Sequence, residues 1–204
     1  MKQVILDRIK ALGGNIEGVK GTSLEADLKA ISFDTVLYPK PQDTPWAAAD
    51  DQEPIQGLND FVEDNRMLFN TNRARFYDQM LGHFYCLTNG FYGQTVFQNE
   101  PFTPFTAGTE SFAEWEGEWE EATWRQTIKG EQMELMFIGQ AYGHPDHLLV
   151  CLTDPNPENP QVYGTDHETF FDEISVEGTL EDYFDRFMTK EELLTIVKAK
   201  LEIE

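Results

Sequence analysis

Basic residues are scarce in this sequence. Only 15 of its 204 residues are Lys or Arg, against 37 that are Asp or Glu, which gives a formal net charge of −22. A surface of that sign repels phosphate backbones and anionic lipid, so nucleic acid and membranes are poor partners. The same surface attracts basic proteins and speeds their encounter. The composition therefore predicts a basic protein partner, although acidity also occurs where it serves only solubility.

Cysteine is rare, and long apolar runs are missing. Cys86 and Cys151 each lie inside an apolar segment, where a cysteine is by default a small buried hydrophobe. No disulfide framework or CxxC metal site is present, and no run reaches the roughly 20 apolar residues that span a bilayer. Asp7, Arg8 and Lys10 interrupt the N-terminal apolar residues, unlike the core of a signal peptide. We therefore expect a cytoplasmic protein.

Motifs of familiar catalytic chemistry are also missing. The glycines form no GxGxxG or GxxxxGK[ST] loop that would bind phosphate, so no nucleotide cofactor is expected. No serine-centred elbow and no Cys/His nucleophile pattern occurs. The sequence thus favours a protein that is not an enzyme.

Apolar periodicity predicts helices in the first half of the chain. Four segments carry an apolar stripe at three- and four-residue steps: 4–12, 24–31, 54–62 and 72–90. A capping-box pattern at Thr22 begins the second, and Pro54 suits the first turn of the third. Asn89 and Gly90 are expected to end the fourth, because both accept the left-handed conformation. Between the second and third helices, SFDTVLYPKP is typical of a brief strand.

In the second half the period changes to two. Five strands are expected, in the segments QTVFQ, MELMFIGQ, HLLVCLT, QVYGTD and FFDEISV. Capping-box patterns beginning at Thr179 and Thr189 then start two closing helices. Successive strands with segregated helices predict an α+β fold, with N-terminal helices, a largely antiparallel sheet of about five or six strands, and C-terminal helices.

The segment FAEWEGEWEEATW, between the first two of these five strands, is expected to be helical. One side of that helix would carry Phe112, Trp115, Trp119 and Ala122, and the opposite side Glu114, Glu118 and Glu121. The tryptophans can belong to the core with the glutamates in solvent, or the segment can be a surface for a basic partner with aromatic anchors. On the second interpretation the candidate partner-binding residues are Trp46, from a polar loop, and Glu114, Trp115, Glu118, Trp119 and Glu121.

Two clusters of histidine and acid, HPDH and TDHE, are the candidates for metal or acid–base chemistry. Their zinc-, iron- or manganese-ligating side chains would be His144, Asp146, His147, Asp166 and His167. In a meander sheet the two clusters can meet, since one begins a strand and the other ends the next. Their spacing matches no established metal-binding pattern. We expect both to be strand-end turns that hold no metal, with His167 making a turn-stabilising hydrogen bond, and keep a metal-dependent enzyme as an alternative.

The segments FYCLTNGF, VYGTDHE and SVEGTLEDYFDRFM follow one another in an order that resembles the SUKH superfamily. In that family a helix runs into an Asn-Gly turn, here Asn89 and Gly90. A later strand enters an Asp-His-Glu turn, here Asp166, His167 and Glu168, and an aromatic-rich helix follows, here 180–187. The resemblance covers residues 73–188. On this basis we expect 1–204 to be a single domain of SUKH type in which 1–72 forms an N-terminal helical extension.

This resemblance implies a function. The superfamily comprises bacterial toxin-immunity proteins and fungal regulators of cell-wall synthesis. It implies an α+β binding domain without catalytic residues, which neutralises a cognate protein toxin in the cytoplasm of the cell that makes it. The alternative is a regulatory or scaffold protein of the cell-wall type. In either case we expect a monomer or weak homodimer.

Overall fold

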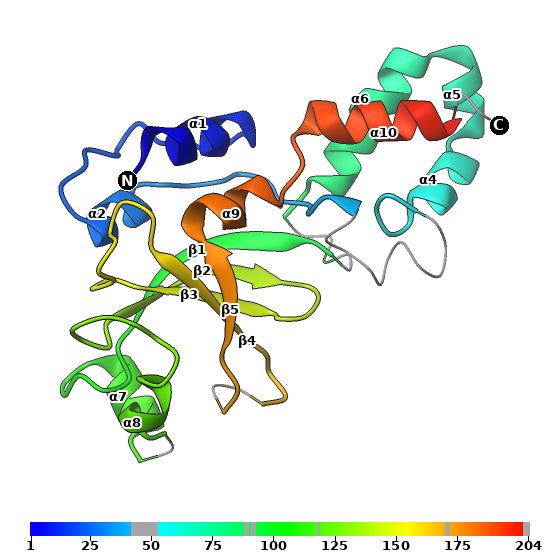
Figure 1. Cartoon of the computed structure of the whole chain (residues 1–204). Helices are drawn as coiled ribbons and strands as arrows, with labels where there is room; N and C mark the ends of the chain where they lie inside the picture. Colours follow the sequence, from blue (N-terminus) through cyan, green and yellow to red (C-terminus); the bar gives the residue numbers. More distant parts are fainter. Residues whose placement is uncertain (42–52, 88–89, 91–92, 118, 170–171, 202–204) are drawn as a thin grey trace.

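The computed structural model describes residues 1–41, 53–87, 90, 93–117, 119–169 and 172–201. Within them, nine helices accompany one five-stranded antiparallel sheet, and helices lie at both ends of the chain (Figure 1). This arrangement confirms the predicted α+β class.

The sheet is a simple meander. Its strands are β1 (Thr95–Phe102), β2 (Leu135–Ala141), β3 (His147–Cys151), β4 (Gln161–Thr165) and β5 (Ser175–Thr179). They lie in the order β1-β2-β3-β4-β5, and each neighbouring pair is antiparallel. The start of β3 therefore lies beside the end of β4, where His147 pairs with Thr165.

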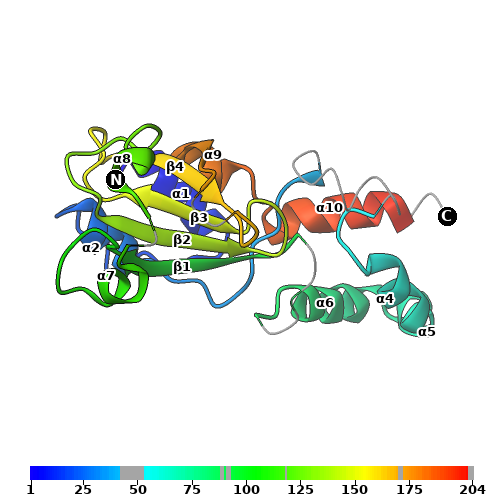
Figure 2. The same ribbon diagram turned by 90° about the horizontal axis from the view of Figure 1, so that it is seen from below.

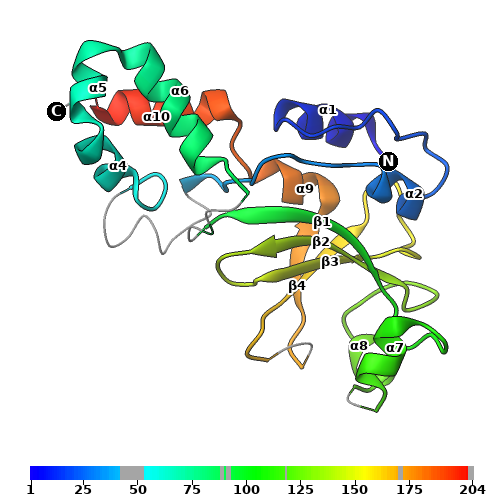
Figure 3. The ribbon, with the colours of Figure 1, turned by 180° about the vertical axis from the view of Figure 1, so that it is seen from behind.

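One face of the sheet is covered by α1 (Gln3–Ala11), α2 (Leu24–Lys29) and α9 (Leu180–Asp185), as Figures 1 and 3 show. Alternation along the strands directs five apolar side chains to this face: Met136, Ile138, Leu148, Val150 and Val162. Ile5, Ile9, Tyr183 and Phe184 pack against them and are almost completely buried. This face is thus a closed hydrophobic core.

The opposite face is covered by the segment between β1 and β2, which holds α7 (Glu110–Trp115) and α8 (Glu121–Trp124). The buried strand residues here are Phe102, Leu135, Leu149, Cys151 and Tyr163. Trp124 and Ile128 pack on them, and the Tyr163 hydroxyl accepts a hydrogen bond from the Lys129 backbone N–H at 2.9 Å. Cys151 is buried and unpaired in a disulfide, as expected for a small buried hydrophobe.

A second group of helices lies beyond the end of the sheet (Figure 2). It contains α4 (Leu58–Asp64), α5 (Arg66–Thr71), α6 (Arg73–Phe84) and α10 (Lys190–Leu201), which share an apolar cluster. Gln94 connects this group to the sheet, because its amide donates hydrogen bonds to the Tyr38 hydroxyl at 2.7 Å and to the Phe84 carbonyl at 3.0 Å. The Tyr38 hydroxyl donates to the same carbonyl.

Several predicted boundaries in the first half of the chain are wrong. The helix expected over 72–90 ends at Phe84, and Leu87, which lies within the expected range, is outside the helix and 43% exposed. Asn89 lies outside the described residues, while Gly90 has φ +62°, a left-handed conformation beyond the helix end. The N-cap of α2 is Ser23 rather than Thr22, since the Ser23 hydroxyl accepts from the Ala26 N–H.

The third predicted helix also begins later than expected. Gly57 adopts φ +80° and α4 starts at Leu58, while the Glu53 carboxylate accepts hydrogen bonds from the N–H groups of Gly57 and Asn59. A carboxylate at this position satisfies N–H groups that the first helical turn leaves unpaired. Pro54 therefore precedes the helix. The brief strand expected in SFDTVLYPKP is reduced to isolated bridges at Ser32, Leu37 and Pro39.

Candidate functional site

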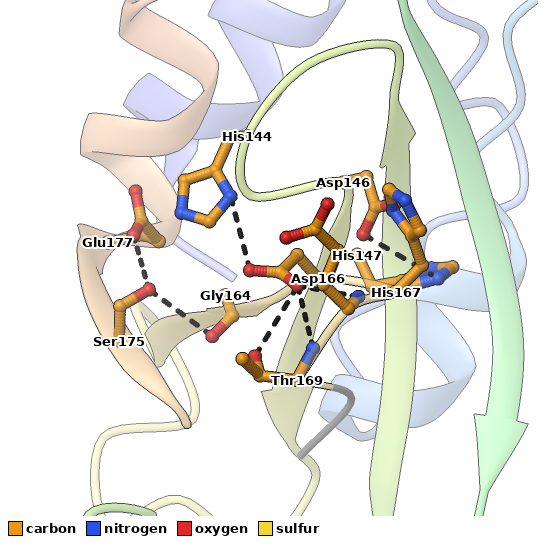
Figure 4. A network of polar contacts seen from close by, with 10 residues as sticks. His144, Asp146, His147, Gly164, Asp166, His167, Thr169, Ser175 and Glu177 are labelled. Atoms are coloured by element: carbon orange, nitrogen blue, oxygen red, sulfur yellow. Dashed lines mark hydrogen bonds and ion pairs between the residues drawn. The ribbon is translucent and has the colours of Figure 1, made fainter. Parts of the chain in front are cut away.

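The segments HPDH and TDHE meet where β3 begins and β4 ends (Figure 4). The Nδ1 atom of His167 lies 2.6 Å from an Asp146 carboxylate oxygen, and the Nδ1 atom of His144 lies 3.2 Å from one of Asp166. Each aspartate therefore pairs with a histidine of the other segment. We call these two pairs the His–Asp crossing.

Asp166 also closes the turn that follows β4. Its Oδ1 atom accepts hydrogen bonds from the backbone N–H groups of Thr169 at 2.9 Å and Glu168 at 2.7 Å. These bonds, that from Thr169 foremost, together with the nearby His144, hold the pKa of Asp166 below its ordinary value. The turn is thus closed by Asp166 and not by His167, whose ring extends toward Asp146 instead.

The imidazole of His167 is 73% exposed at the edge of the crossing. The hydrogen bond with Asp146, and then the charge of that carboxylate, raise the pKa of His167. Over the described ranges, no group of three or more His, Cys, Asp or Glu side chains is arranged to hold a metal ion. The geometry of the crossing therefore gives the metal-ligand hypothesis no support, and it accounts for these side chains as a connection between two strand ends.

A hollow of about 380 Å³ lies between α7 and the part of the sheet formed by β1, β2 and β3. Its walls are Gln98, Glu100, Pro101, Phe102, Glu110, Ser111, Glu114, Trp115, Phe137 and His147. The volume falls in the range of about 300–1,000 Å³ that small-molecule sites occupy. His147 adjoins the crossing as well, because its Nε2 atom lies 3.7 Å from Asp146 Oδ1 and its ring centroid 5.8 Å from that of Phe137.

The alternation of side chains along β1 forms the sheet side of the hollow. Gln98, Glu100 and Phe102 follow one another at two-residue steps and line the hollow from the same face of the strand. The register shifts in this part of the sheet, since Phe97 pairs with Gly139 and Glu100 pairs with Phe137. Glu100 therefore lies beside Phe137 in the wall of the hollow.

A break in the predicted helix shapes the other side. The single helix expected through FAEWEGEWEEATW is wrong, because α7 ends at Trp115 and α8 begins at Glu121. Gly117 lies between them with φ +83°, a conformation that other residues adopt only under strain. The hydroxyl of Thr109 caps α7 by accepting from the Phe112 N–H at 3.2 Å. The chain can therefore turn between the two short helices.

The tryptophans of this segment pack to different depths. Trp124 is 1% exposed and lies in the core, with its ring 4.9 Å from Phe105 and 6.2 Å from Phe102. Trp115 and Trp119 are half-buried and stack on each other, with ring centroids 4.6 Å apart and planes at 17°. Trp115 packs toward the core cluster and also forms a wall of the hollow. The interpretation of this segment as a surface for a basic partner stays a prediction.

Three glutamates surround the hollow: Glu100 from β1 and Glu110 and Glu114 from α7. All three are exposed, and none forms an ion pair with any Lys, Arg or His that the structure describes. Glu110 and Glu114 stand four residues apart on one helix, so their carboxylates repel each other. The hollow therefore combines an unneutralised negative charge with aromatic walls.

The predicted partner-binding residues separate in the structure. Glu114 and Trp115 line the hollow, whereas Glu121 forms an ion pair with Arg125, with 2.6 Å between Arg125 Nη2 and Glu121 Oε1. Trp119 packs behind Trp115. Trp46 and Glu118 lie outside the described residues.

The sequence alone did not identify Glu100, Glu110 or the rings of Phe102 and Phe137 as parts of a site. Glu110 stands four residues before Glu114, and this spacing is visible in the sequence. Glu100 and Phe137 reach the hollow only through the pairing of β1 with β2.

No helix in the described ranges is long and apolar enough to cross a membrane. A scan against protein-family models and searches of curated proteins and solved structures found no match to the chain.

Proposed function

We propose that this chain is a non-enzymatic binding domain of SUKH type, and that it acts as an immunity protein that neutralises a basic protein toxin in the bacterial cytoplasm. The observation that carries the proposal is the net charge of −22 together with a hollow where glutamates and aromatic rings stand side by side. Long-range attraction would guide a basic partner to the surface, and the hollow would hold one of its side chains.

The His–Asp crossing supports a role in folding rather than in catalysis. Its two aspartates meet histidines of the same chain, and Asp166 in addition accepts two backbone hydrogen bonds. Such pairs hold the strand ends together. His144 and His167 are not among the residues that line the hollow.

The test is co-purification of the chain with the product of the neighbouring gene, at low and at high salt. We expect a basic partner to be retained at low salt and released as salt rises, because salt screens exposed charges beyond a distance of about 10 Å at 0.1 M. Co-expression should also relieve the toxicity of that partner.

Three outcomes would contradict parts of the proposal. Retention that is indifferent to salt would remove its electrostatic part. Retention of a basic protein that is not toxic would favour the regulatory or scaffold alternative. Turnover of a substrate by the purified chain, lost in His167→Ala while the fold persists, would contradict the non-enzymatic function.

A further inference from the structure

We infer that the hollow between α7 and the sheet binds the guanidinium group of an arginine side chain that a protein partner presents. The inference rests on the proposed function for the source of that arginine, and it adds the surface and the chemical group through which binding occurs. Three features of the hollow carry it: its charge, its aromatic walls and its shape.

The negative charge of the hollow favours a cation as its occupant. Glu100, Glu110 and Glu114 approach the hollow from a strand and a helix, so their carboxylates surround it from two sides. The described residues supply no ion-pair partner to any of the three. A guanidinium group has five N–H donors in a plane and can serve more than one carboxylate at a time. Its arrival would also relieve the repulsion between Glu110 and Glu114.

The aromatic walls favour arginine over other cations. Phe102, Trp115 and Phe137 line the hollow together with the glutamates. A guanidinium is planar and weakly hydrated, so it stacks on aromatic rings at a lower desolvation cost than an ammonium. Trp119 stacks on Trp115 at 4.6 Å, so this ring already has an aromatic packing partner before binding.

The donor set disfavours a metal ion as the occupant. The hollow does contain His147 besides its glutamates. Across the described part of the chain, however, no three His, Cys, Asp or Glu side chains converge closely enough to coordinate a metal. Carboxylates spaced around aromatic walls suit a larger, flat cation that reaches several of them.

The experiment is a titration of the full chain, labelled with ¹⁵N, with the peptide acetyl-Gly-Arg-Gly-amide. The indole N–H of Trp115 is assigned with Trp115→Phe and followed by NMR. We expect saturable shifts of this signal. The peptide with citrulline in place of arginine, which has the same shape without the charge, should bind at least about tenfold more weakly. The lysine peptide should lie between the two, because its ammonium stacks less well on aromatic rings.

Matched variants separate the site from general electrostatics. Glu100→Gln, Glu110→Gln and Glu114→Gln combined should weaken the arginine peptide at least about tenfold. The control combines Glu17→Gln, Glu63→Gln and Glu131→Gln, which removes the same number of charges from exposed positions outside the hollow. It should change the affinity less than about twofold, since distant exposed charges are screened. The dispersion of each spectrum reports whether the variant is folded.

The possible results are distinguishable. Equal weakening in the two triple variants, or equal binding of the arginine and citrulline peptides, would overturn the inference. Absence of a saturable shift at Trp115 would overturn it as well. If the peptide occupies the hollow while no toxin is retained, the proposed function fails and the inference stands. If a toxin is retained equally by the chain and by the hollow triple variant, the inference fails and the function stands.

Discussion

Carboxylates lie at two neighbouring places on the sheet, and the two sets differ in whether basic side chains of the chain lie beside them. In the His–Asp crossing, Asp146 and Asp166 lie 2.6 Å and 3.2 Å from histidines of the same chain. At the hollow, the carboxylates of Glu100, Glu110 and Glu114 meet no basic side chain among the described residues. Charges that the chain pairs internally connect its strands, and charges that it leaves beside aromatic rings are available to a partner.

The aromatic residues of the same face show a parallel difference. Trp124 lies at the base of the segment and is fully packed, whereas Trp115 stands at the rim and lines the hollow. A side chain that serves only packing should be costly to remove. A side chain that serves binding should cost little stability and much affinity.

The largest expected effect is the loss of stability when Trp124 is truncated, compared with the loss when Trp115 is truncated. Trp124→Ala should lower the free energy of unfolding by about 3–5 kcal/mol, because it leaves a cavity between Phe102, Phe105 and the sheet. Trp115→Ala should cost clearly less, since the indole is only half-buried. Urea denaturation of both variants measures the two losses. Equal losses would break the distinction between a packing and a binding tryptophan.

An intermediate loss of stability is expected when the helix cap around Asp182 is removed. The carboxylate of this residue accepts hydrogen bonds from its own chain. Its Oδ2 atom accepts hydrogen bonds from the Thr179 backbone N–H at 2.8 Å and the Thr179 hydroxyl at 2.7 Å. The first of these bonds, together with the bond that the Asp182 N–H donates to the Thr179 hydroxyl at 3.3 Å, forms the predicted capping box at the start of α9. Thr179→Ala should cost about 0.5–2 kcal/mol of stability by chemical denaturation. Thr195→Ala, at an exposed position within α10, is the control and should be close to neutral.

The same cap has a defined pH dependence. Hydrogen bonds from Thr179, the backbone N–H foremost, lower the pKa of Asp182 from its ordinary 3.8. A lowered pKa in the folded state means that this stabilisation is present above pH 3.8 and is lost as the pH falls through the folded value. The difference between the wild-type chain and Thr179→Ala should therefore shrink in acid. A difference that grows in acid would contradict the capping role.

The smallest expected effect is a difference in stability between a variant of the His–Asp crossing and a variant of the hollow. Asp146 raises the pKa of His167 above 6.5, so the pair contributes stability below pH 6.5 and loses it as the pH rises through the folded value. His167→Gln should therefore destabilise the chain slightly at pH 6 and not detectably at high pH. Glu114→Gln, which removes a charge that no described Lys, Arg or His pairs with, should cost no stability at either pH. Chemical denaturation of both variants at pH 6 and at high pH measures the two changes in stability. A loss of stability at pH 6 in Glu114→Gln as large as in His167→Gln would contradict the distinction between the crossing and the hollow.

Local patterns in the sequence were enough to predict β2, β3, β4 and the first half of β1, the capping boxes of the last two helices and the meeting of HPDH with TDHE. The fifth expected strand, FFDEISV, is wrong in its bounds, because β5 covers Ser175–Thr179 and shares only Ser175 and Val176 with that segment. Period-two segments in succession predict a meander, which places the start of HLLVCLT near the end of QVYGTD, and in the structure His147 pairs with Thr165. The Thr189 box forms as expected, with Thr189 and Glu192 exchanging hydrogen bonds. These features depend on residues that are close in sequence or on neighbouring strands.

The hollow depends on longer-range geometry. The register between β1 and β2 places Glu100 beside Phe137, and apolar alternation alone does not specify that register. Gly117 adopts a positive φ between α7 and α8, and the apolar pattern of the predicted helix does not specify that conformation. The ends of the 72–90 helix and of α4 were wrong for a similar reason, since tertiary contacts decide where a helix stops.

The most direct test of the central claim is an isotope-filtered NOE experiment on the labelled chain with bound acetyl-Gly-Arg-Gly-amide. If the unneutralised glutamates and aromatic walls form a binding site, NOEs will connect the side-chain CH₂ protons of the arginine next to the guanidinium to the rings of Trp115 and Phe137. NOEs that are confined to other parts of the surface at saturating peptide would contradict the claim.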